Sequence, residues 1–129
     1  MENKKTFLLV DDDVDDQDIF VIALGKVDKN IACIRASDGP RAIVKLKTDG
    51  QFIPDYIFLD MNMPKMNGLQ CLSEIRRINR SKKVKIFMYT TTADPYLIKA
   101  SKELGADGLL VKPASLNKLI ETLRNLLQE

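Results

Sequence analysis

Residues 56–64 read Tyr-Ile-Phe-Leu-Asp-Met-Asn-Met-Pro, and this stretch decides the fold. Its four leading apolar residues have the length and composition of a strand that is buried on both faces of a sheet. The run ends in the carboxylate of Asp60, and Pro64 disfavours a helical backbone at Met63, so the chain passes into a loop. In an open α/β sheet, ligands bind at the edge where the strands end. We therefore expect Asp60 to lie at the tip of a buried strand, within a binding site.

The bulk composition predicts one ordinary globular domain. The chain has 129 residues, of which 45% are hydrophobic and 29% are charged. A net charge of +2 indicates neither a nucleic-acid nor a membrane partner. The longest uninterrupted apolar run, residues 19–24, is too short to span a bilayer, and residues 1–5 lead into acids instead of a signal-peptide cleavage site. We expect a single domain over residues 1–129 in a cytoplasmic protein with no membrane partner.

The cysteine and histidine content restricts the chemistry. Cys33 and Cys71 are far apart and form no metal-ligand spacing, so both are expected to be reduced thiols in or near the core. Histidine is absent, which excludes catalytic triads that use histidine as a base, zinc sites with histidine ligands, and a phosphohistidine carrier. Any reaction must therefore use carboxylates, hydroxyls, lysines or a hard metal ion.

The apolar pattern alternates between strands and helices along the whole chain. Apolar runs predict strands at residues 6–10, 31–36, 56–59, 84–89 and 108–111. Helices are expected at residues 14–24 and 42–47 and after the starts at Asn67-Gly68, Asp94-Pro95 and Ser115. In the first of these helices Asp13 is interpreted as a start residue, and Asp15, Asp16 and Asp18 suit the positive end of the helix dipole. This alternation predicts an α/β fold with a parallel sheet and helices on both faces.

Polar residues follow four of the five predicted strands. They are Asp11 and Asp12, Asp60, Thr90 and Lys112. Parallel strands end at one edge of a sheet, so we expect these side chains to be neighbours. Acidic oxygen ligands without histidine or cysteine suit a hard ion such as Mg²⁺. Lysine can pair with Asp60 and then with a phosphoryl oxygen, and a threonine hydroxyl can donate to another. We expect Asp60 to act as a nucleophile that takes up a phosphoryl group.

These motifs resemble those of one known family. Residues 8–12 (Leu-Leu-Val-Asp-Asp), residues 59–64 with Gly68 following, Thr90, and Lys112-Pro113 are similar to the receiver domain of two-component response regulators. The resemblance covers residues 7–127. It implies a doubly wound, flavodoxin-like (βα)5 fold with a five-stranded parallel sheet in the order 2-1-3-4-5, and a single receiver domain of the chemotaxis type.

The resemblance also implies roles for the acidic residues. Asp60 would be the phosphoacceptor for a phosphoryl group from the phosphohistidine of a sensor histidine kinase or phosphotransfer protein. Asp12 would ligate Mg²⁺ directly, Asp11 would act through water, and the backbone carbonyl of Asn62 would complete the protein ligands together with Asp60. The protein would catalyse its own phosphorylation and dephosphorylation without being a conventional enzyme.

Further implications concern the other strand ends and the output. Thr90 and Lys112 would contact the phosphoryl oxygens, and the Lys112–Pro113 peptide would be cis. Leu109 stands where many receivers have an aromatic residue. The output therefore travels through the loop of residues 90–94, or Leu109 is ordinary core packing, and the sequence leaves both open. A downstream protein is the expected target, and a weak homodimer is allowed through the helix after Asp94, strand 108–111 and the last helix.

One basic run invites a nucleic-acid interpretation. It comprises Arg76, Arg77, Arg80, Lys82, Lys83 and Lys85. No aromatic residues are interleaved with it, and it lies at the edge opposite the expected site. We interpret it as a solvated loop, with a protein partner as the alternative, and expect no direct contact with nucleic acid.

Two other functions remain to be weighed against the signalling switch. A phosphatase of the haloacid-dehalogenase type would use Asp11 as its nucleophile within Asp11-Asp12-Asp13. No acid pair follows Lys112 to hold its metal, and the chain has no room for a cap domain. A receiver-like scaffold that is never phosphorylated is the second alternative, against which the complete set of acids argues.

Overall fold

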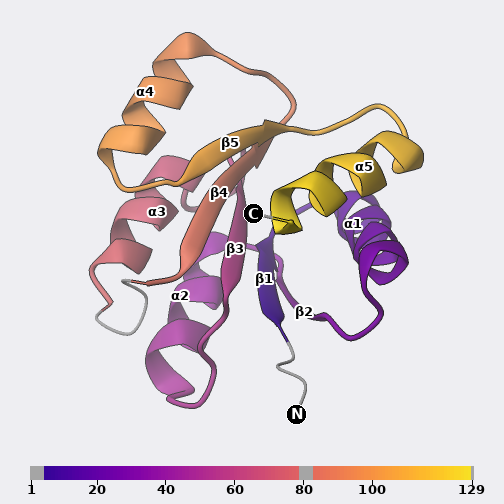
Figure 1. Ribbon diagram of the computed structural model, residues 1–129. Coiled ribbons are helices and arrows are strands. Elements are labelled where there is room, and N and C mark those ends of the chain that lie inside the picture. Colours follow the sequence, from indigo (N-terminus) through magenta and orange to yellow (C-terminus); the bar gives the residue numbers. More distant parts are fainter. Residues whose placement is uncertain (1–4, 79–82, 129) are drawn as a thin grey trace.

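The computed structural model describes residues 5–78 and 83–128 of the chain. The described residues form five strands and five helices in strict alternation (Figure 1). They are β1 (Thr6–Val10), α1 (Val14–Val27), β2 (Ala32–Ala36), α2 (Gly39–Thr48), β3 (Tyr56–Asp60), α3 (Gly68–Arg76), β4 (Lys85–Thr90), α4 (Pro95–Glu103), β5 (Gly108–Val111) and α5 (Leu116–Leu127). The predicted alternation is therefore confirmed.

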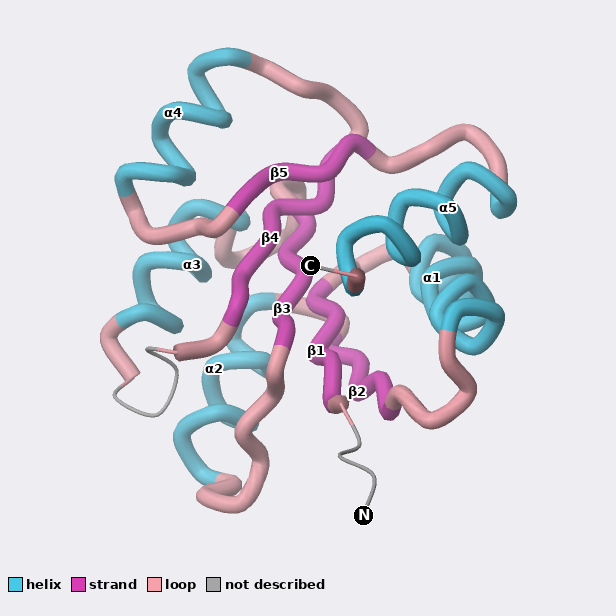
Figure 2. Tube along the Cα trace, viewed as in Figure 1, coloured by secondary structure: helices cyan, strands magenta, loops and turns pink. Residues whose placement is uncertain are grey.

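The five strands form one parallel sheet in the order β2-β1-β3-β4-β5. Helices α1 and α5 cover one face, and α2, α3 and α4 lie on the other side (Figure 1; Figure 2). The doubly wound fold and the expected strand order are confirmed. The order reverses direction between β1 and β3, which is the position where ligands bind in sheets of this kind.

The alternation of side chains along each strand builds two hydrophobic cores. Phe7, Leu9 and Phe58 pack with α1 and α5, whereas Leu8 and Ile57 pack with α2 and α3. All five of these side chains are completely buried. The central strands are apolar on both faces because helices cover both, which is why they read as continuous apolar runs.

A capping side chain precedes each of the five helices. Asp13, Asp38, Asn67, Asp94 and Ser115 each accept a hydrogen bond from a backbone N–H in the first turn of the helix that follows. Asn67 and Gln70 satisfy each other's backbone N–H groups in a capping box. These caps fix where each helix begins after a strand-end loop, and they confirm Asp13 as a helix-start residue.

Several boundaries differ from the predicted ones by a few residues. Strand β2 begins at Ala32, and only Ala36 within it is buried, because β2 is an edge strand with a single neighbour. Strand β4 is shifted by one residue and includes Thr90 as its last residue. Helix α1 continues to Val27, beyond the predicted end at Leu24.

The expected cis peptide at Lys112–Pro113 is wrong. The described residues contain no cis peptide bond. The two isomers of an X-Pro bond differ by only about 0.5–1 kcal/mol in an unconstrained chain, so local sequence does not decide between them.

Arg76 does not belong to a solvated loop, contrary to the prediction. Its guanidinium donates to the backbone carbonyls of Gly105 at 2.9 Å and Val84 at 3.0 Å, and it pairs with Asp107 at 3.1 Å. Asp107 in turn accepts from the N–H of Ile86 at 2.8 Å. Arg76 therefore ties the end of α3 to the starts of β4 and β5.

The rest of the basic run is less constrained. Arg77, Lys83 and Lys85 are exposed, as expected. Arg80 and Lys82 lie outside the described residues. Both cysteines are free thiols, Cys71 buried and Cys33 partly buried, in agreement with the prediction. Within residues 5–78 and 83–128, no helix is both long and apolar enough to cross a membrane.

Candidate functional site

The register of the central strands brings two acids together. Val10 of β1 is paired with Leu59 of β3, so the next residues, Asp11 and Asp60, lie side by side where the two strands end. Asp11 is two residues beyond Leu9 and Asp60 is two residues beyond Phe58, and both of those side chains belong to the core beneath α1 and α5. The alternation of the strands therefore directs both carboxylates to the same side of the sheet.

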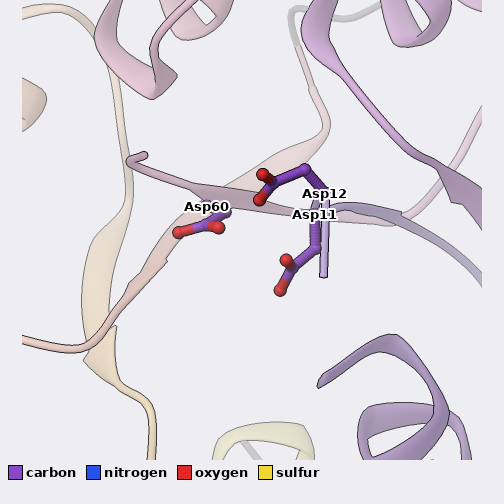
Figure 3. Close-up of side chains that lie close together, drawn as sticks. All are labelled: Asp11, Asp12 and Asp60. Atoms are coloured by element: carbon purple, nitrogen blue, oxygen red, sulfur yellow. The ribbon is translucent and has the colours of Figure 1, made fainter. Parts of the chain in front are cut away.

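Asp11, Asp12 and Asp60 form one acidic cluster at this edge (Figure 3). One carboxylate oxygen from each residue lies within 4.8 Å of the other two. Asp11 is completely buried, Asp60 is 6% exposed and Asp12 is exposed to solvent. Three convergent carboxylates with one side open to water fit a hard divalent cation, which takes oxygen ligands and retains several waters.

Lys112 lies just after β5 and reaches into the same cluster. Its Nζ lies 2.9 Å from Asp11 Oδ2, 2.8 Å from Asp16 Oδ2 and 3.5 Å from Asp60 Oδ2. The ammonium also lies 5.3 Å from the centre of the Tyr89 ring. The predicted pairing of lysine with Asp60 is present, but Asp11 and Asp16 hold the ammonium more closely.

Asp16 was not recognised from the sequence as part of the site. It was interpreted as a helix-dipole residue, which accounts for its position in the first turn of α1. One available signal is its spacing from Asp12, since residues four apart lie on the same side of a helix. That signal is weak, because Asp12 precedes the helix and because Asp15 and Asp18 are equally acidic neighbours.

The surroundings of Asp60 change its ionisation. Burial, followed by the neighbouring Asp11 carboxylate, raises the pKa of Asp60 to about 6, with partial compensation by the Lys112 ammonium. Burial alone would lower the pKa of Lys112, but hydrogen bonds to Asp16 and Asp11 and the charge of Asp60 raise it above its ordinary value. Asp60 is thus a carboxylate at neutral pH that is easily protonated in mild acid, beside a firmly charged ammonium.

Backbone hydrogen bonds hold the acid-bearing loops. The Gln17 side chain donates to the Asp11 carbonyl at 2.5 Å, and the Asp13 N–H donates to Asp11 Oδ1 at 2.9 Å. The Asn62 N–H donates to Asp60 Oδ1 at 3.4 Å, a long contact that leaves this carboxylate loosely held. Asn62 lies on the loop directly after β3, and this contact places its backbone beside the predicted site.

Thr90 lies at the same edge of the sheet but belongs to the other face. It is the last residue of β4 and is 1% exposed. With Leu97, Ser101 and Leu109 it lines a small space, too narrow for a water molecule, between α4 and the sheet. In the part of the chain that the structure describes, no hydrogen bond joins the Thr90 side chain to Asp60. Leu109 packs against the core on the α2 and α3 side, next to Thr90.

The fold and the site define a class of protein: a flavodoxin-like sheet with an acidic cluster at its switch point, into which a lysine that follows β5 reaches. In agreement with this class, residues 7–124 match the family model of the response regulator receiver domain. The chain belongs to this family, whose members are phosphoacceptor signalling modules of two-component systems.

Individual relatives agree with this assignment. A probable transcriptional regulator, ycf27, from Guillardia theta is 34% identical over 128 residues, which make up 99% of this chain and 47% of that protein. Among solved structures, the phosphorylated cyanobacterial phytochrome response regulator RcpA has a TM-score of 0.87 at 25% identity, with 96% of this chain and 91% of that chain covered. The Mn²⁺-bound form of response regulator Rcp1 has a TM-score of 0.82 at 27% identity, covering 95% and 91%. The chain spans about half the length of the first curated relatives that it matches.

Proposed function

We propose that this receiver domain accepts a phosphoryl group on Asp60 from the phosphohistidine of a sensor histidine kinase or phosphotransfer protein. The reaction depends on Mg²⁺, and the phosphorylated form controls a downstream protein. One observation carries the proposal. Three carboxylates lie within 4.8 Å of one another, and an ammonium lies 3.5 Å from the carboxylate of Asp60.

The contacts of the two buried acids favour Asp60 as the nucleophile. Asp11 is completely buried, and its two oxygens are engaged by the Asp13 N–H and the Lys112 ammonium. Asp60 retains some exposure, and its contacts with Asn62 and Lys112 are 3.4 and 3.5 Å long. This difference argues against the alternative phosphatase that would attack through Asp11.

The acidic cluster supports a bound divalent cation. Asp12 and Asp60 would supply carboxylate oxygens, Asp11 would act through a bound water, and Asn62 would supply its backbone carbonyl. The chemistry that Mg²⁺ supplies when bound is neutralisation of the charge on the phosphoryl oxygens during transfer. Response regulator Rcp1, which has a similar fold, has been solved in a Mn²⁺-bound form, and this agrees with the proposal.

Lys112 and Thr90 would both bind phosphoryl oxygens at this edge of the sheet. Lys112 would approach from the face covered by α1 and α5, and Thr90 from the face on which α4 lies. Lys112 is already within ion-pair distance of Asp60. Thr90 would donate its hydroxyl after the loop of residues 90–94 moves toward Asp60, which would change the space that Thr90 shares with Leu97 and Leu109. If the ratio of the moved to the unmoved loop conformation is to change from 1:99 to 99:1, the phosphoryl group must favour the moved conformation by about 5.5 kcal/mol.

Phosphorylation of the intact chain by acetyl phosphate and Mg²⁺ tests the proposal. We expect mass spectrometry to detect one phosphoryl adduct in the wild type and none in Asp60→Asn or in the presence of EDTA. Asp15→Asn, which removes an exposed acid from the neighbouring helix turn, is the matched control and should retain the adduct. An adduct that persists in Asp60→Asn, or steady turnover of small phosphoesters, would contradict the proposal, and a wild type without any adduct would favour the scaffold.

A further inference from the structure

The Lys112 ammonium is shared unequally among three carboxylates. It donates hydrogen bonds to Asp11 at 2.9 Å and to Asp16 at 2.8 Å, whereas Asp60 lies at the longer ion-pair distance of 3.5 Å. The Lys112 side chain is only 11% exposed, so little water competes for its donors. An ammonium has three donors, and two of them are engaged by Asp11 and Asp16 instead of by the proposed phosphoacceptor.

The two closer partners of Lys112 have different positions in the site. Asp11 belongs to the acidic cluster with Asp12 and Asp60, and its carboxylate can serve a cation as well as the lysine. Asp16 is outside that cluster, on α1, and its side chain is 36% exposed. Its contact with Lys112 joins residues 96 positions apart, linking α1 to the end of β5. Asp16 therefore contributes to the site through the lysine.

We propose that Asp16 is a positioning residue that holds the Lys112 ammonium off Asp60 in the unphosphorylated protein and competes for it with the phosphoryl oxygens. This inference rests on the proposed phosphorylation of Asp60. When a phosphoryl group reaches Asp60, its oxygens attract the Lys112 ammonium, and any movement of the ammonium toward them lengthens its 2.8 Å hydrogen bond to Asp16. A stronger hydrogen bond between Asp16 and Lys112 thus makes the phosphorylated arrangement less favourable.

Competition of this kind has opposite effects on cation and anion binding. In Asp16→Asn the neutral amide is a weaker acceptor for the ammonium, so Lys112 moves closer to Asp60. Metal binding should then weaken, because the ammonium neutralises more of the negative charge on Asp60 that would otherwise attract the cation. A phosphoryl analogue should bind more tightly, because no strong hydrogen bond has to be broken. A general loss of structure would weaken both.

Titration calorimetry on the full chain tests the inference with Mg²⁺ alone and then with beryllofluoride at saturating Mg²⁺. For Asp16→Asn we expect the Kd for Mg²⁺ to rise about fivefold and the Kd for beryllofluoride to fall about fivefold. A fivefold change corresponds to about 1 kcal/mol, which is the free energy that a partly exposed ion pair contributes. Asp15→Asn removes the same charge from the same helix turn, and none of the contacts in the described part of the chain joins Asp15 to Lys112. It should bind both ligands like the wild type.

The possible results separate this inference from the function on which it rests. Unchanged affinities in Asp16→Asn, weaker binding of both ligands, or equal shifts in Asp15→Asn would overturn the positioning role while leaving the proposed function intact. A wild type that does not bind beryllofluoride would overturn both. Asp16→Ser provides the same comparison if Asp16→Asn does not fold, and failure of both variants to fold would identify Asp16 as structural and overturn the inference.

Discussion

At the scale of single residues, the ionisation of Asp60 reduces the stability of the fold. Burial and the neighbouring Asp11 raise the pKa of Asp60 from 3.8 to about 6. Between these two values the folded protein binds a proton more readily than the unfolded chain does. The folded protein is therefore favoured by the protonated form of Asp60. This contribution to stability is fully present below pH 3.8 and is lost as the pH rises through about 6.

Asp60→Asn should consequently stabilise the protein at neutral pH. In EDTA at pH 7.5 we expect the free energy of unfolding to rise by about 2 kcal/mol, less than the full shift implies because the site is partly hydrated. The gain should disappear near pH 4, which urea denaturation at several pH values will measure. Asp38→Asn is a control of opposite sign, because the N–H of Arg41, followed by smaller electrostatic contributions, lowers the pKa of Asp38. A gain for Asp60→Asn that does not depend on pH would contradict the argument.

At the scale of elements, the start of α3 is held very close to the end of β3. A Cβ at Gly68 would lie 2.5 Å from the Asp60 carbonyl oxygen and 2.9 Å from Met61 Cα. Both are backbone atoms that cannot move without displacing the loop that carries Asp60. We expect Gly68→Ala to destabilise the protein by about 2 kcal/mol and to slow phosphorylation of Asp60.

Gly25 in α1 supplies the matched control for this substitution. A Cβ there would meet nothing within 4 Å. Gly25→Ala should stabilise the protein by about 0.5–1 kcal/mol, because alanine has the higher helix propensity, and should leave phosphorylation unchanged. Thermal denaturation and the rate of adduct formation measure the two effects. Equal stability changes in the two variants would show that the close approach at Gly68 is unimportant.

The contacts of Arg76 join three elements at the opposite edge of the sheet. Arg76→Ala removes donors to the carbonyls of Gly105 and Val84 and leaves Asp107 without its guanidinium. We expect a loss of about 2–3 kcal/mol in unfolding free energy. Arg77→Ala, one residue away, removes a side chain that is 74% exposed and should change stability by less than about 0.5 kcal/mol. Similar losses in the two variants, measured by urea denaturation, would contradict the structural role of Arg76.

At the scale of the whole molecule, one sheet separates two hydrophobic cores. Phe20 of α1 and Leu72 of α3 are completely buried on opposite faces, and β1 and β3 contribute side chains to both cores. Because the two cores share these strands, we expect them to unfold together. Phe20→Ala and Leu72→Ala should each lower the stability of a single transition, by about 3–5 and 2–5 kcal/mol. Circular dichroism and hydrogen exchange will measure this, and a second transition in either variant would contradict it.

The sequence by itself determined the alternation of strands and helices, the helix caps, and the placement of Asp11, Asp12, Asp60, Thr90 and Lys112 at the strand ends. These features follow from local periodicity and from the fact that parallel strands end at one edge. Only the tertiary structure decided that Lys112 is closest to Asp16 and Asp11, that Thr90 belongs to the other face, and that Arg76 is bound within the fold. Such contacts join residues as many as 101 positions apart. They depend on how the sheet twists and how the helices pack across it, and the spacing of residues along the chain does not specify either.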